Sequence, residues 1–427
     1  MTERTTVATR LACALSTVLG TTESPWRLRA WDGSEAGPPG APPLTIRTPQ
    51  AVRRLAWAPG ELGLARAYVA GEIEIEGDLF ATLEVLDSVG RLSSTGAFQR
   101  PRAADRLALL RTAVTLGAVG PPPAPPPEEF VRPRRGRRHS RRRDAVAVAH
   151  HYDVSNDFYE LVLGPTMVYS CAVWADEGAG LDAAQEAKID LVCRKLGLRP
   201  GMRLLDVGCG WGSLALHAAQ RYGVDVVGIT LSARQADLAR RRVAAAGLDG
   251  RITVRVQDYR EVADGPFDAI SSIGMAEHVG RVALPGYATA LHDLLRPGGR
   301  LLNHAISWTA GATRWDDDTF IARYVFPDGE VLPLALTVAA LDAAGFELLD
   351  VEALRRHYAV TLRAWVERLE KQWDAAVDLT SEGRARVWRL YMAASALSFE
   401  AGKLGIEQVL VQRPGGDPPP LRLRHWI

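Results

Sequence analysis

The chain has 427 residues, of which 47% are hydrophobic and 24% charged, and its formal net charge is +1. This ordinary globular composition excludes collagen-like, coiled-coil and disordered chains. Four scattered cysteines exclude a disulfide framework, and no CxxC or CxxH pair suggests zinc. No apolar stretch approaches the roughly 20 residues that a bilayer span needs. We therefore expect a reduced, soluble, cytoplasmic protein with two domains.

The first 120 residues are predicted to form a small mixed α/β domain. Residues 44–47 alternate like a short strand, and 50–57 begin a helix. Residues 60–80 continue as a helix and then an alternating edge strand, and a further apolar-rich helix covers 105–117. No catalytic cluster of carboxylates, histidines or cysteines stands out in this part, which indicates a binding or positioning module.

A linker rich in proline and arginine is predicted over 121–144. Residues 121–127 read PPPAPPP, and 132–143 read RPRRGRRHSRRR, with eight arginines. Proline stiffens the first stretch and mutual repulsion extends the second, so neither is expected to build a core. Two roles stay open for the arginines. One is a solvated tether, and the other is a polybasic segment for an anionic membrane surface, where each basic residue contributes about 1 kcal/mol.

The second domain, 145–427, contains a strand, a glycine turn and a helix in immediate succession. The apolar run 202–207 suits a buried parallel strand, and it ends in the turn GCGWG at 208–212. Glycine is needed there because a Cβ would hold a ligand away from the backbone.

The alternation of strands and helices continues beyond this turn. Further strands are predicted at 224–229, 251–256, 267–273, 300–306 and 406–412, with helices at 232–246 and 284–295 and an RPGG turn at 296–299. Such repetition predicts an α/β fold with a doubly wound, Rossmann-like parallel sheet and right-handed crossovers.

The glycine turn fits S-adenosylmethionine better than a dinucleotide. Its spacing is GxGxG rather than GxGxxG, and Asp206 stands directly before it. Thr230 follows the second strand, where an acidic residue would bind an NAD ribose. Together with the later LRPGG turn, this pattern favours S-adenosylmethionine over a nucleotide or a degenerate site.

Seven blocks of the second domain resemble the cyclopropane-fatty-acyl-phospholipid synthase family, which includes mycolate cyclopropane synthases and unsaturated-phospholipid methyltransferases. The blocks are HHYDVSNDFYELVLG (150–164), MVYSCAVW (167–174), LLDVGCGWGSLALHAA (204–219), GITLSARQ (228–235), GMAEHVG (274–280), FIARYVFPDG (320–329) and HYAVTLRAW (357–365). Residues 57–80 also resemble the extra, lipid-engaging N-terminal domain of the phospholipid-acting members. The resemblance implies a class I methyltransferase sheet with helical insertions around a substrate cavity.

The resemblance also implies the reaction. Methyl transfer from S-adenosylmethionine to a cis double bond leaves a carbocation on the acyl chain, and bound bicarbonate removes a proton to close a cyclopropane ring. The alternative product is a methylene- or methyl-branched chain of the tuberculostearate type. Matched residue by residue, the bicarbonate cage is Cys171, Glu277, His304, the backbone of Ile306, and Tyr358. Cys171 is not interpreted as a covalent nucleophile, because no neighbouring base in the sequence supports that role.

The cofactor-binding residues implied by the resemblance extend from the methionine end to the adenine end. They are Tyr152, Ser170, Asp206, Gly208, Gly210, Gly212, Thr230, Gln235, Asp258, Tyr259 and Ile273. At Asp258 and Tyr259 the chain departs from the mycolate members, which carry a Trp–Glu-like pair there. Cys209 is expected to line the same pocket, and Cys13 and Cys193 are expected in the core.

The expected partner is unsaturated phospholipid at an anionic membrane surface, bound peripherally from the inner face by a homodimer. Aromatic residues in 315–334 and 361–402 form either core or an apolar tunnel for the acyl chain. A nucleic-acid substrate is disfavoured, because GMAEHVG stands where an NPPY-like motif would follow the fourth strand. A decayed, non-enzymatic binding protein is disfavoured because every cage residue is present.

Overall fold

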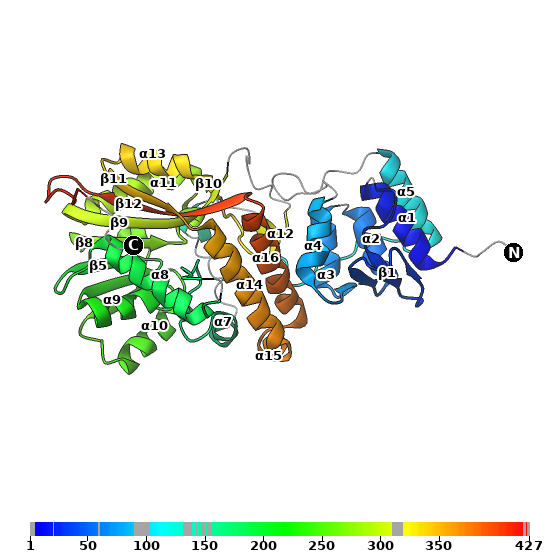
Figure 1. The fold of residues 1–427 in the computed structure, drawn as a ribbon, viewed down its shortest axis with the longest axis horizontal. Coiled ribbons are helices and arrows are strands. Elements are labelled where there is room, and N and C mark those ends of the chain that lie inside the picture. Colours follow the sequence, from blue (N-terminus) through cyan, green and yellow to red (C-terminus); the bar gives the residue numbers. More distant parts are fainter. Residues whose placement is uncertain are drawn as a thin grey trace. The chain divides into compact units, whose positions relative to one another are not determined.

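The computed structural model of the chain describes residues 5–19, 21–58, 60–88, 103–130, 139–141, 143–144, 146, 151, 155–176, 178–309, 319–421 and 424. The chain divides into two compact units. Unit 1 comprises residues 1–131, 315–325 and 373–397, and unit 2 comprises 132–314, 326–372 and 398–427. Figure 1 shows their elements, and each unit is described by itself.

Unit 1 is built around a small sheet in the order β2-β1-β3-β4. Its strands are β1 (Arg27–Ala30), β2 (Glu35–Ala36), β3 (Pro43–Ile46) and β4 (Ile73–Ile75). β1 and β3 are parallel, and the other pairs are antiparallel. The strand predicted at 44–47 and the edge strand predicted within 60–80 are confirmed as β3 and β4.

Unit 1 also contains helices, and some of them come from distant parts of the chain. They are α1 (Val7–Leu19), α2 (Pro49–Trp57), α3 (Glu61–Val69), α4 (Leu79–Ser88), α5 (Ala103–Thr115), α12 (Phe320–Tyr324), α15 (Trp373–Leu379) and most of α16 (Glu382–Glu400). The buried Arg386 of α16 pairs with Glu74 of β4 and with Glu382. Such long-range pairs explain why residues 373–397 join the N-terminal unit.

The proline-rich stretch is held against unit 1. Arg54 Nη1 donates to the Ala124 carbonyl at 2.8 Å, and the buried Glu129 accepts from Arg66 at 2.6 and 2.7 Å. Glu129 also accepts from the hydroxyl of Tyr324 at 3.1 Å. Residues 121–127 form no helix or strand, as expected of an extended segment, but one of their carbonyls is bound by an arginine of unit 1. The passage from unit 1 to unit 2 falls at 131/132, inside the predicted linker.

Unit 2 contains an eight-stranded sheet in the order β11-β12-β9-β8-β5-β6-β7, with β10 beside β9. Its strands are β5 (Arg203–Val207), β6 (Asp225–Thr230), β7 (Ile252–Val256), β8 (Phe267–Ile273), β9 (Leu295–Trp308), β10 (Leu332–Pro333), β11 (Glu347–Ala353) and β12 (Leu404–Gln412). β5 to β9 pair in parallel, and β12 is antiparallel to β9. The predicted parallel sheet is confirmed.

Helices cover both faces of this sheet, as a doubly wound fold requires (Figure 1). One apolar core joins it to α8 (Leu181–Leu196), α9 (Ser213–Tyr222) and α10 (Ala233–Ala245), and a second joins it to α11 (Ala276–Leu294) and α13 (Leu334–Ala343). Unit 2 also holds α7 (Asn156–Leu163), α14 (Arg355–Lys371) and the 3-10 helix η1 (Tyr259–Glu261). In the described ranges, no helix has the length and apolarity to cross a membrane.

Two local predictions in unit 2 need correction. The turn predicted at 296–299 lies within β9, since Gly298 N donates to the Arg413 carbonyl and Arg413 N donates to that of Gly299. The helix predicted at 284–295 begins at Ala276, with a kink at Gly280, where φ is 73°. The left-handed Gly280 and the internal Pro285 interrupt the helical pattern that sequence reasoning follows.

Candidate functional site

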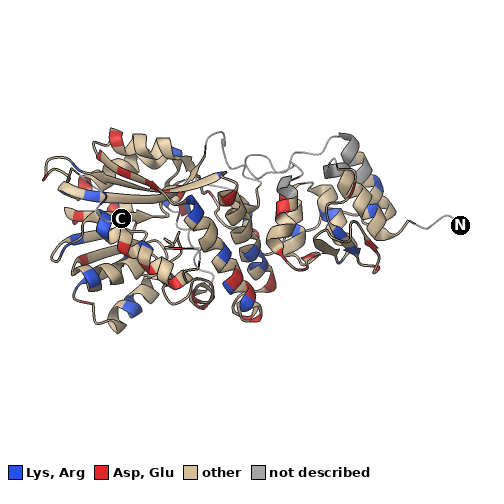
Figure 2. Ribbon diagram, in the orientation of Figure 1, with Lys and Arg blue, Asp and Glu red and all other residues tan. Residues whose placement is uncertain are grey.

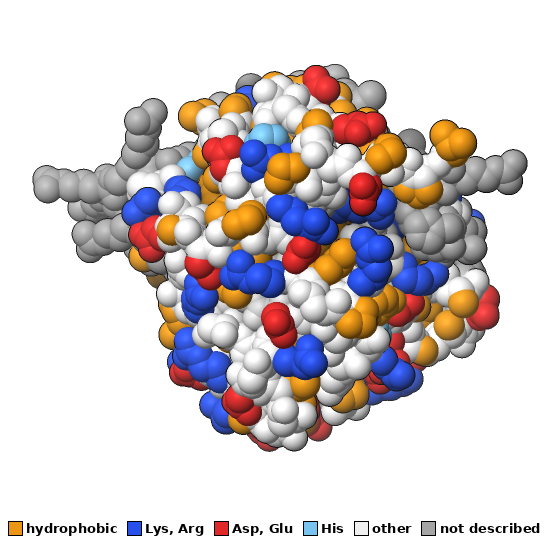
Figure 3. All heavy atoms as spheres, turned by 90° about the vertical axis from the view of Figure 1, so that its left-hand side faces the viewer, with side chains coloured by type: hydrophobic (Ala, Val, Ile, Leu, Met, Phe, Trp, Pro, Cys, Tyr) orange, Lys and Arg blue, Asp and Glu red, His pale blue; other side chains and the backbone are white. Residues whose placement is uncertain are grey.

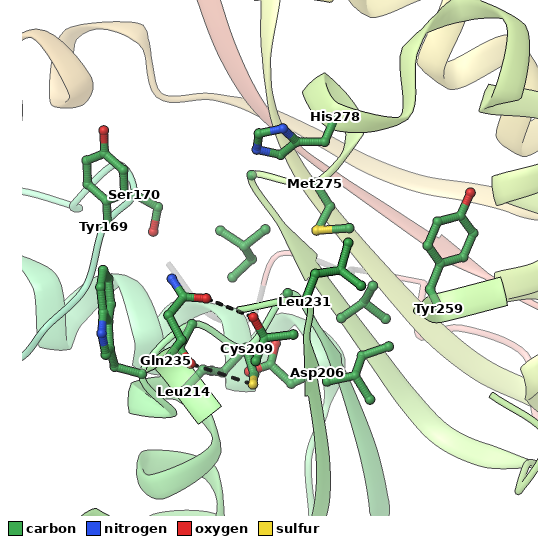
Figure 4. Close-up of a pocket in the computed structure, with 18 of the residues that line it drawn as sticks. Tyr169, Ser170, Asp206, Cys209, Leu214, Leu231, Gln235, Tyr259, Met275 and His278 are labelled. Atoms are coloured by element: carbon green, nitrogen blue, oxygen red, sulfur yellow. Dashed lines mark hydrogen bonds between the residues drawn. The ribbon is translucent and has the colours of Figure 1, made fainter. Parts of the chain in front are cut away.

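A pocket lies at the carboxyl ends of the parallel strands of unit 2, where open α/β sheets bind ligands (Figure 4). The predicted cofactor residues that line it are Ser170, Asp206, Gly208, Gly210, Thr230, Gln235, Asp258, Tyr259 and Ile273, and Cys209 also lines it. Gly212 is not in the lining but precedes α9 as its N-cap residue. Tyr152 lies outside the described residues.

The glycine turn after β5 forms the floor of this pocket. Gly208 has φ 79°, and a Cβ there would lie 2.7 Å from the side chain of Met275. Both the backbone angle and the space therefore require glycine. Asp206, on β5, accepts a 2.8 Å hydrogen bond from Ser271 Oγ, and burial raises its pKa to about 6.

Thr230 and Gln235 form one wall of the pocket. Thr230 Oγ1 donates to Gln235 Oε1 at 2.8 Å, and Ser232 Oγ caps α10 by accepting from Gln235 N at 3.2 Å. The amide is thereby oriented with its nitrogen on the side away from Thr230 (Figure 4). This wall offers amide and hydroxyl groups, with no carboxylate, to a ligand.

Asp258 forms a further part of the lining, together with Arg260. Arg260 donates to both carboxylate oxygens of Asp258, at 2.6 and 2.7 Å, and to Asp144 at 2.9 Å. Burial opposes ionisation of Asp258, but the hydrogen bonds from Arg260 prevail and lower its pKa. The ring of Tyr259 meets Tyr287 edge-on, with 5.4 Å between centroids.

Several pocket residues were not identified from the sequence, chiefly Lys188 on α8 and Met275 and His278 around the start of α11. Figure 4 shows Met275 and His278 beside the pocket. Burial lowers the pKa of His278 to about 4, so this imidazole is neutral near pH 7. His278 follows Glu277 within GMAEHVG, and that motif could have identified it. Lys188 carries only the weak signal of a lysine in a largely apolar stretch.

The described end of the arginine-rich segment binds to the rim of the pocket. Arg143 pairs with Asp328, with Nη2 donating to Oδ1 at 2.7 Å, and Arg141 pairs with Glu261 at 2.8 Å. His139 Nδ1 lies 3.1 Å from the carbonyl of His278. These three residues belong to unit 2. Residues 131–138 and 142 of the predicted linker lie outside the described residues.

Glu277 and His304 form a second polar cluster, at the carboxyl end of β9. Glu277 Oε1 accepts from the backbone N–H of Ile306 at 2.7 Å, and burial raises the Glu277 pKa to about 7. Glu277 Oε2 and both ring nitrogens of His304 are buried with no hydrogen-bonding partner in the described ranges. His304 is only 1% exposed, and burial lowers its pKa well below the ordinary value, so the imidazole is neutral.

Cys171 and Tyr358 both bond to the backbone of Leu354, which lies beside the β12–β9 pair. The Cys171 thiol lies 3.7 Å from the Leu354 carbonyl, which also accepts from Tyr358 N at 3.1 Å. Leu354 N donates to the carbonyl of Ile406, the residue opposite Ile306 in the β12–β9 pair. These bonds place the Cys171 thiol and the first turn of α14, which carries Tyr358, close to the β12–β9 pair at Ile306. Burial raises the pKa of the Cys171 thiol, which therefore stays protonated.

The other cysteines and the aromatic residues are placed as follows. Cys193 is buried as predicted, but Cys13 is exposed, because it lies on the outer side of α1. Most of the described aromatic residues in the two predicted stretches are buried. Phe320, Tyr324, Trp388 and Tyr391 lie in unit 1, and Trp365 and Phe399 lie in unit 2.

Comparisons with known proteins match this architecture. Residues 139–409 match the family described as mycolic acid cyclopropane synthetase. A probable fatty acid methyltransferase of Mycobacterium tuberculosis is 44% identical over 431 residues, which cover 99% of both chains. The cyclopropane-fatty-acyl-phospholipid synthase of Escherichia coli is 39% identical over 274 residues, 64% of this chain and 69% of the relative. The crystal structure of mycolic acid cyclopropane synthase CmaA1 with S-adenosylhomocysteine superposes with a TM-score of 0.60 at 35% identity, covering 63% of this chain and 98% of that one.

Proposed function

Because the chain belongs to the mycolic acid cyclopropane synthetase family of S-adenosylmethionine-dependent methyltransferases, we propose that it modifies cis double bonds in acyl chains of membrane phospholipids and forms cyclopropane rings. The observation that carries this proposal is the polar cluster of Glu277 and His304, with buried atoms that need a partner. Buried polar atoms in proteins seldom lack a hydrogen-bonding partner, so the cluster is suited to binding a small polar molecule or ion.

The chemistry places specific demands on the chain. The cofactor supplies an electrophilic methyl group. An isolated alkene is a weak nucleophile, so the residues contribute mainly orientation and exclusion of water. The cation that forms on the acyl chain must then lose a proton to a base. Cys171 and His304 are buried, which keeps the surroundings of that step dry.

We assign bicarbonate as that base, held by Cys171, Glu277, His304, the Ile306 backbone and Tyr358. A small oxyanion that both donates and accepts hydrogen bonds can satisfy Glu277 Oε2 and the two His304 nitrogens. A carboxyl with a pKa of about 7 is partly protonated near neutral pH and can donate to an anion rather than repel it. Neutral His304 can orient the anion or receive its proton.

The direct test is a lipid assay with the purified full-length protein. It is incubated with vesicles of phosphatidylglycerol carrying cis-monounsaturated chains, S-adenosylmethionine and bicarbonate, and the acyl methyl esters are then analysed by mass spectrometry. A mass gain of one methylene without a remaining alkene is expected. A retained exocyclic alkene overturns ring formation, and a gain confined to non-phospholipid acyl carriers overturns the substrate.

A methylene- or methyl-branched product of the tuberculostearate type is the second candidate. It is favoured by the relative that matches 99% of both chains, which is named as a probable fatty acid methyltransferase. The same cage serves this outcome if a hydride shift precedes proton loss. The lipid assay separates the two products.

Access to lipid requires a membrane-facing surface, and we propose that unit 1 and the arginine-rich segment supply it at the inner face of the membrane. Unit 1 exposes large apolar side chains on α5 and near it: Trp57, Leu107, Leu110, Val114 and Val119. Leu107, Leu110 and Val114 have the spacing of one helix face. Trp57 is 58% exposed, and tryptophan is favoured at membrane interfaces.

The charge distribution supports the same assignment. Acidic and basic residues are interspersed along the described elements (Figure 2) and on the face of unit 2 in Figure 3. That face therefore offers no field of a single sign to an anionic bilayer. The arginine-rich segment concentrates positive charge instead.

Vesicle co-sedimentation tests this role with four arginines of the segment that lie outside the described residues. Changing Arg134, Arg135, Arg137 and Arg138 to Ser is expected to weaken binding to anionic vesicles about 10-fold or more and to reduce its salt sensitivity. The control variant changes four exposed arginines of unit 2 to Ser: Arg199, Arg221, Arg241 and Arg251. Equal vesicle binding by both variants would contradict the membrane role, and the arginine-rich segment would then be interpreted as a solvated tether. Light scattering on the same preparation tests the proposed homodimer.

A further inference from the structure

Lys188 is a buried lysine whose position the proposed reaction does not explain. It lies on α8, is 2% exposed, lines the cofactor pocket, and its Nζ donates to Ser170 Oγ at 2.9 Å. In the described part of the chain, no carboxylate lies within 4.0 Å of this ammonium group. Buried lysines are rare unless they are paired.

Lys195, two turns further along α8, provides the contrast. It is also fully buried, but it pairs with Glu352 and lies 3.9 Å from Asp350. The same helix thus carries one buried lysine with acidic partners and one whose recorded partner is a hydroxyl. An ammonium has three donors, so the Ser170 bond leaves Lys188 with donors for a ligand.

Four titratable groups in the described structure bear on the charge of Lys188, and among them only Asp206 is ionised near pH 7. Asp206 of β5 attracts Lys188 but accepts its hydrogen bond from Ser271. His304 of β9 is neutral, and burial keeps the thiols of Cys171 and Cys193 protonated. Asp206 therefore supplies negative charge near Lys188 without a hydrogen bond to its ammonium in the described structure, and the remaining Lys188 donors are available to an anion in the pocket.

We propose that Lys188 and Ser170 form an oxyanion subsite that binds the carboxylate of the amino-acid part of S-adenosylmethionine. The subsite suits a planar anion of the carboxylate type. Two such anions are available, the carboxylate of the cofactor and bicarbonate. The cofactor is favoured because Lys188 and Ser170 both line its pocket, whereas none of the five cage residues does. Binding at this point would hold the methionine chain and so set the direction of the methyl group.

The test compares ligands that differ only in this carboxylate. Isothermal titration measures the binding of S-adenosylhomocysteine and of its decarboxylated analogue to wild type, Lys188→Met and Lys188→Arg. Lys188→Met is expected to weaken S-adenosylhomocysteine binding at least about 30-fold and to change binding of the analogue less than about 3-fold. Lys188→Arg keeps the charge and is expected to restore most of the difference between the ligands.

The pH dependence of binding provides a second readout in the wild-type protein. Burial lowers the pKa of Lys188 to about 8. The protonated form binds the anion, so affinity for S-adenosylhomocysteine is expected to fall as pH rises above about 8, with no such fall for the analogue. Asp206, with a pKa of about 6, is already ionised in this range, and His304 is already neutral.

Three outcomes would overturn the proposal. Equal loss of both ligands in Lys188→Met indicates a structural role, and no loss of either removes the subsite. In a third outcome, Lys188→Met leaves the difference in affinity between S-adenosylhomocysteine and its analogue unchanged but needs more bicarbonate for half-maximal activity. That result would assign Lys188 to bicarbonate instead of the cofactor carboxylate. If Lys188→Met does not fold, the wild-type pH profiles of the two ligands decide the question alone.

Discussion

The cofactor pocket wall and the cage cluster are two buried polar regions at the same edge of one sheet, but they differ in how their hydrogen bonds are used. In the wall, Thr230 bonds to Gln235, and Asp258 bonds to Arg260. In the cage, Glu277 Oε2 and both nitrogens of His304 have no partner in the described ranges. The wall is therefore pre-organised by its own contacts, whereas the cage depends on what it binds.

This difference has an energetic meaning. A buried polar group left without a partner costs about 1–3 kcal/mol, while a satisfied pair is nearly neutral or favourable. Changes in the wall should therefore affect cofactor binding modestly. Changes in the cage should affect the chemical step strongly and should leave cofactor binding intact. The predictions below test this contrast, from the largest expected effect to the smallest.

Glu277→Gln or Cys171→Ala is expected to lower kcat by about 10³-fold, because each change disrupts the group that positions the base. The affinity for S-adenosylhomocysteine should change less than about 3-fold, since neither residue lines the cofactor pocket. Steady-state lipid assays and isothermal titration measure the two quantities. Loss of cofactor binding in either variant would contradict the assigned role.

Glu277→Gln should also stabilise the ligand-free protein in a pH-dependent way. Burial raises the pKa of Glu277 to about 7, so the folded state holds this proton more tightly than the unfolded state. The free energy of unfolding therefore falls as pH rises from about 4.5 to 7, and this loss is complete above pH 7. At pH 8 the variant should be more stable by about 3 kcal/mol, and near pH 4 the difference should vanish. Urea unfolding at both pH values measures it, and a gain independent of pH would argue against the titration.

Two neighbouring arginines at the pocket rim provide a matched pair. Arg143→Ser leaves Asp328, whose side chain is 7% exposed, without its ion pair and should lower the free energy of unfolding of unit 2 by about 2 kcal/mol. Arg141→Ser breaks the pair with Glu261, in which the side chains are 58% and 49% exposed, and should change it by less than about 0.5 kcal/mol. Similar effects of the two changes in urea unfolding would contradict this account of the rim.

Gln235→Leu is expected to have the smallest effect on activity. It removes the amide that Thr230 orients toward the pocket, so KM for S-adenosylmethionine should rise about 10-fold while kcat changes less than 2-fold. Initial rates at varied cofactor concentration provide both constants. A fall in kcat as large as that of Glu277→Gln would remove the distinction between wall and cage.

The amino-acid sequence by itself determined the parallel sheet and the floor of the cofactor pocket. The strands β5 to β9 follow from apolar runs separated by helical periodicity, and the turn at Gly208 follows from a local backbone requirement. Both signals are contained within a few neighbouring residues. The family motifs proposed the cage positions, and the structure places Glu277 against the Ile306 backbone at the carboxyl end of β9, while the role of these residues stays a prediction.

Only the tertiary structure decided which distant group meets each buried charge. Arg386 meets Glu74 from 312 positions away, and Arg143 meets Asp328 from 185 positions away. These pairs bring residues 373–397 into unit 1 and bind the end of the arginine-rich segment to the pocket rim. The structure likewise distinguished two buried lysines of α8, because Lys195 pairs with a carboxylate and Lys188 bonds to a hydroxyl. The hydrophobic periodicity of a sequence indicates which residues are buried. The group that compensates a buried charge is set by tertiary contacts between distant parts of the chain.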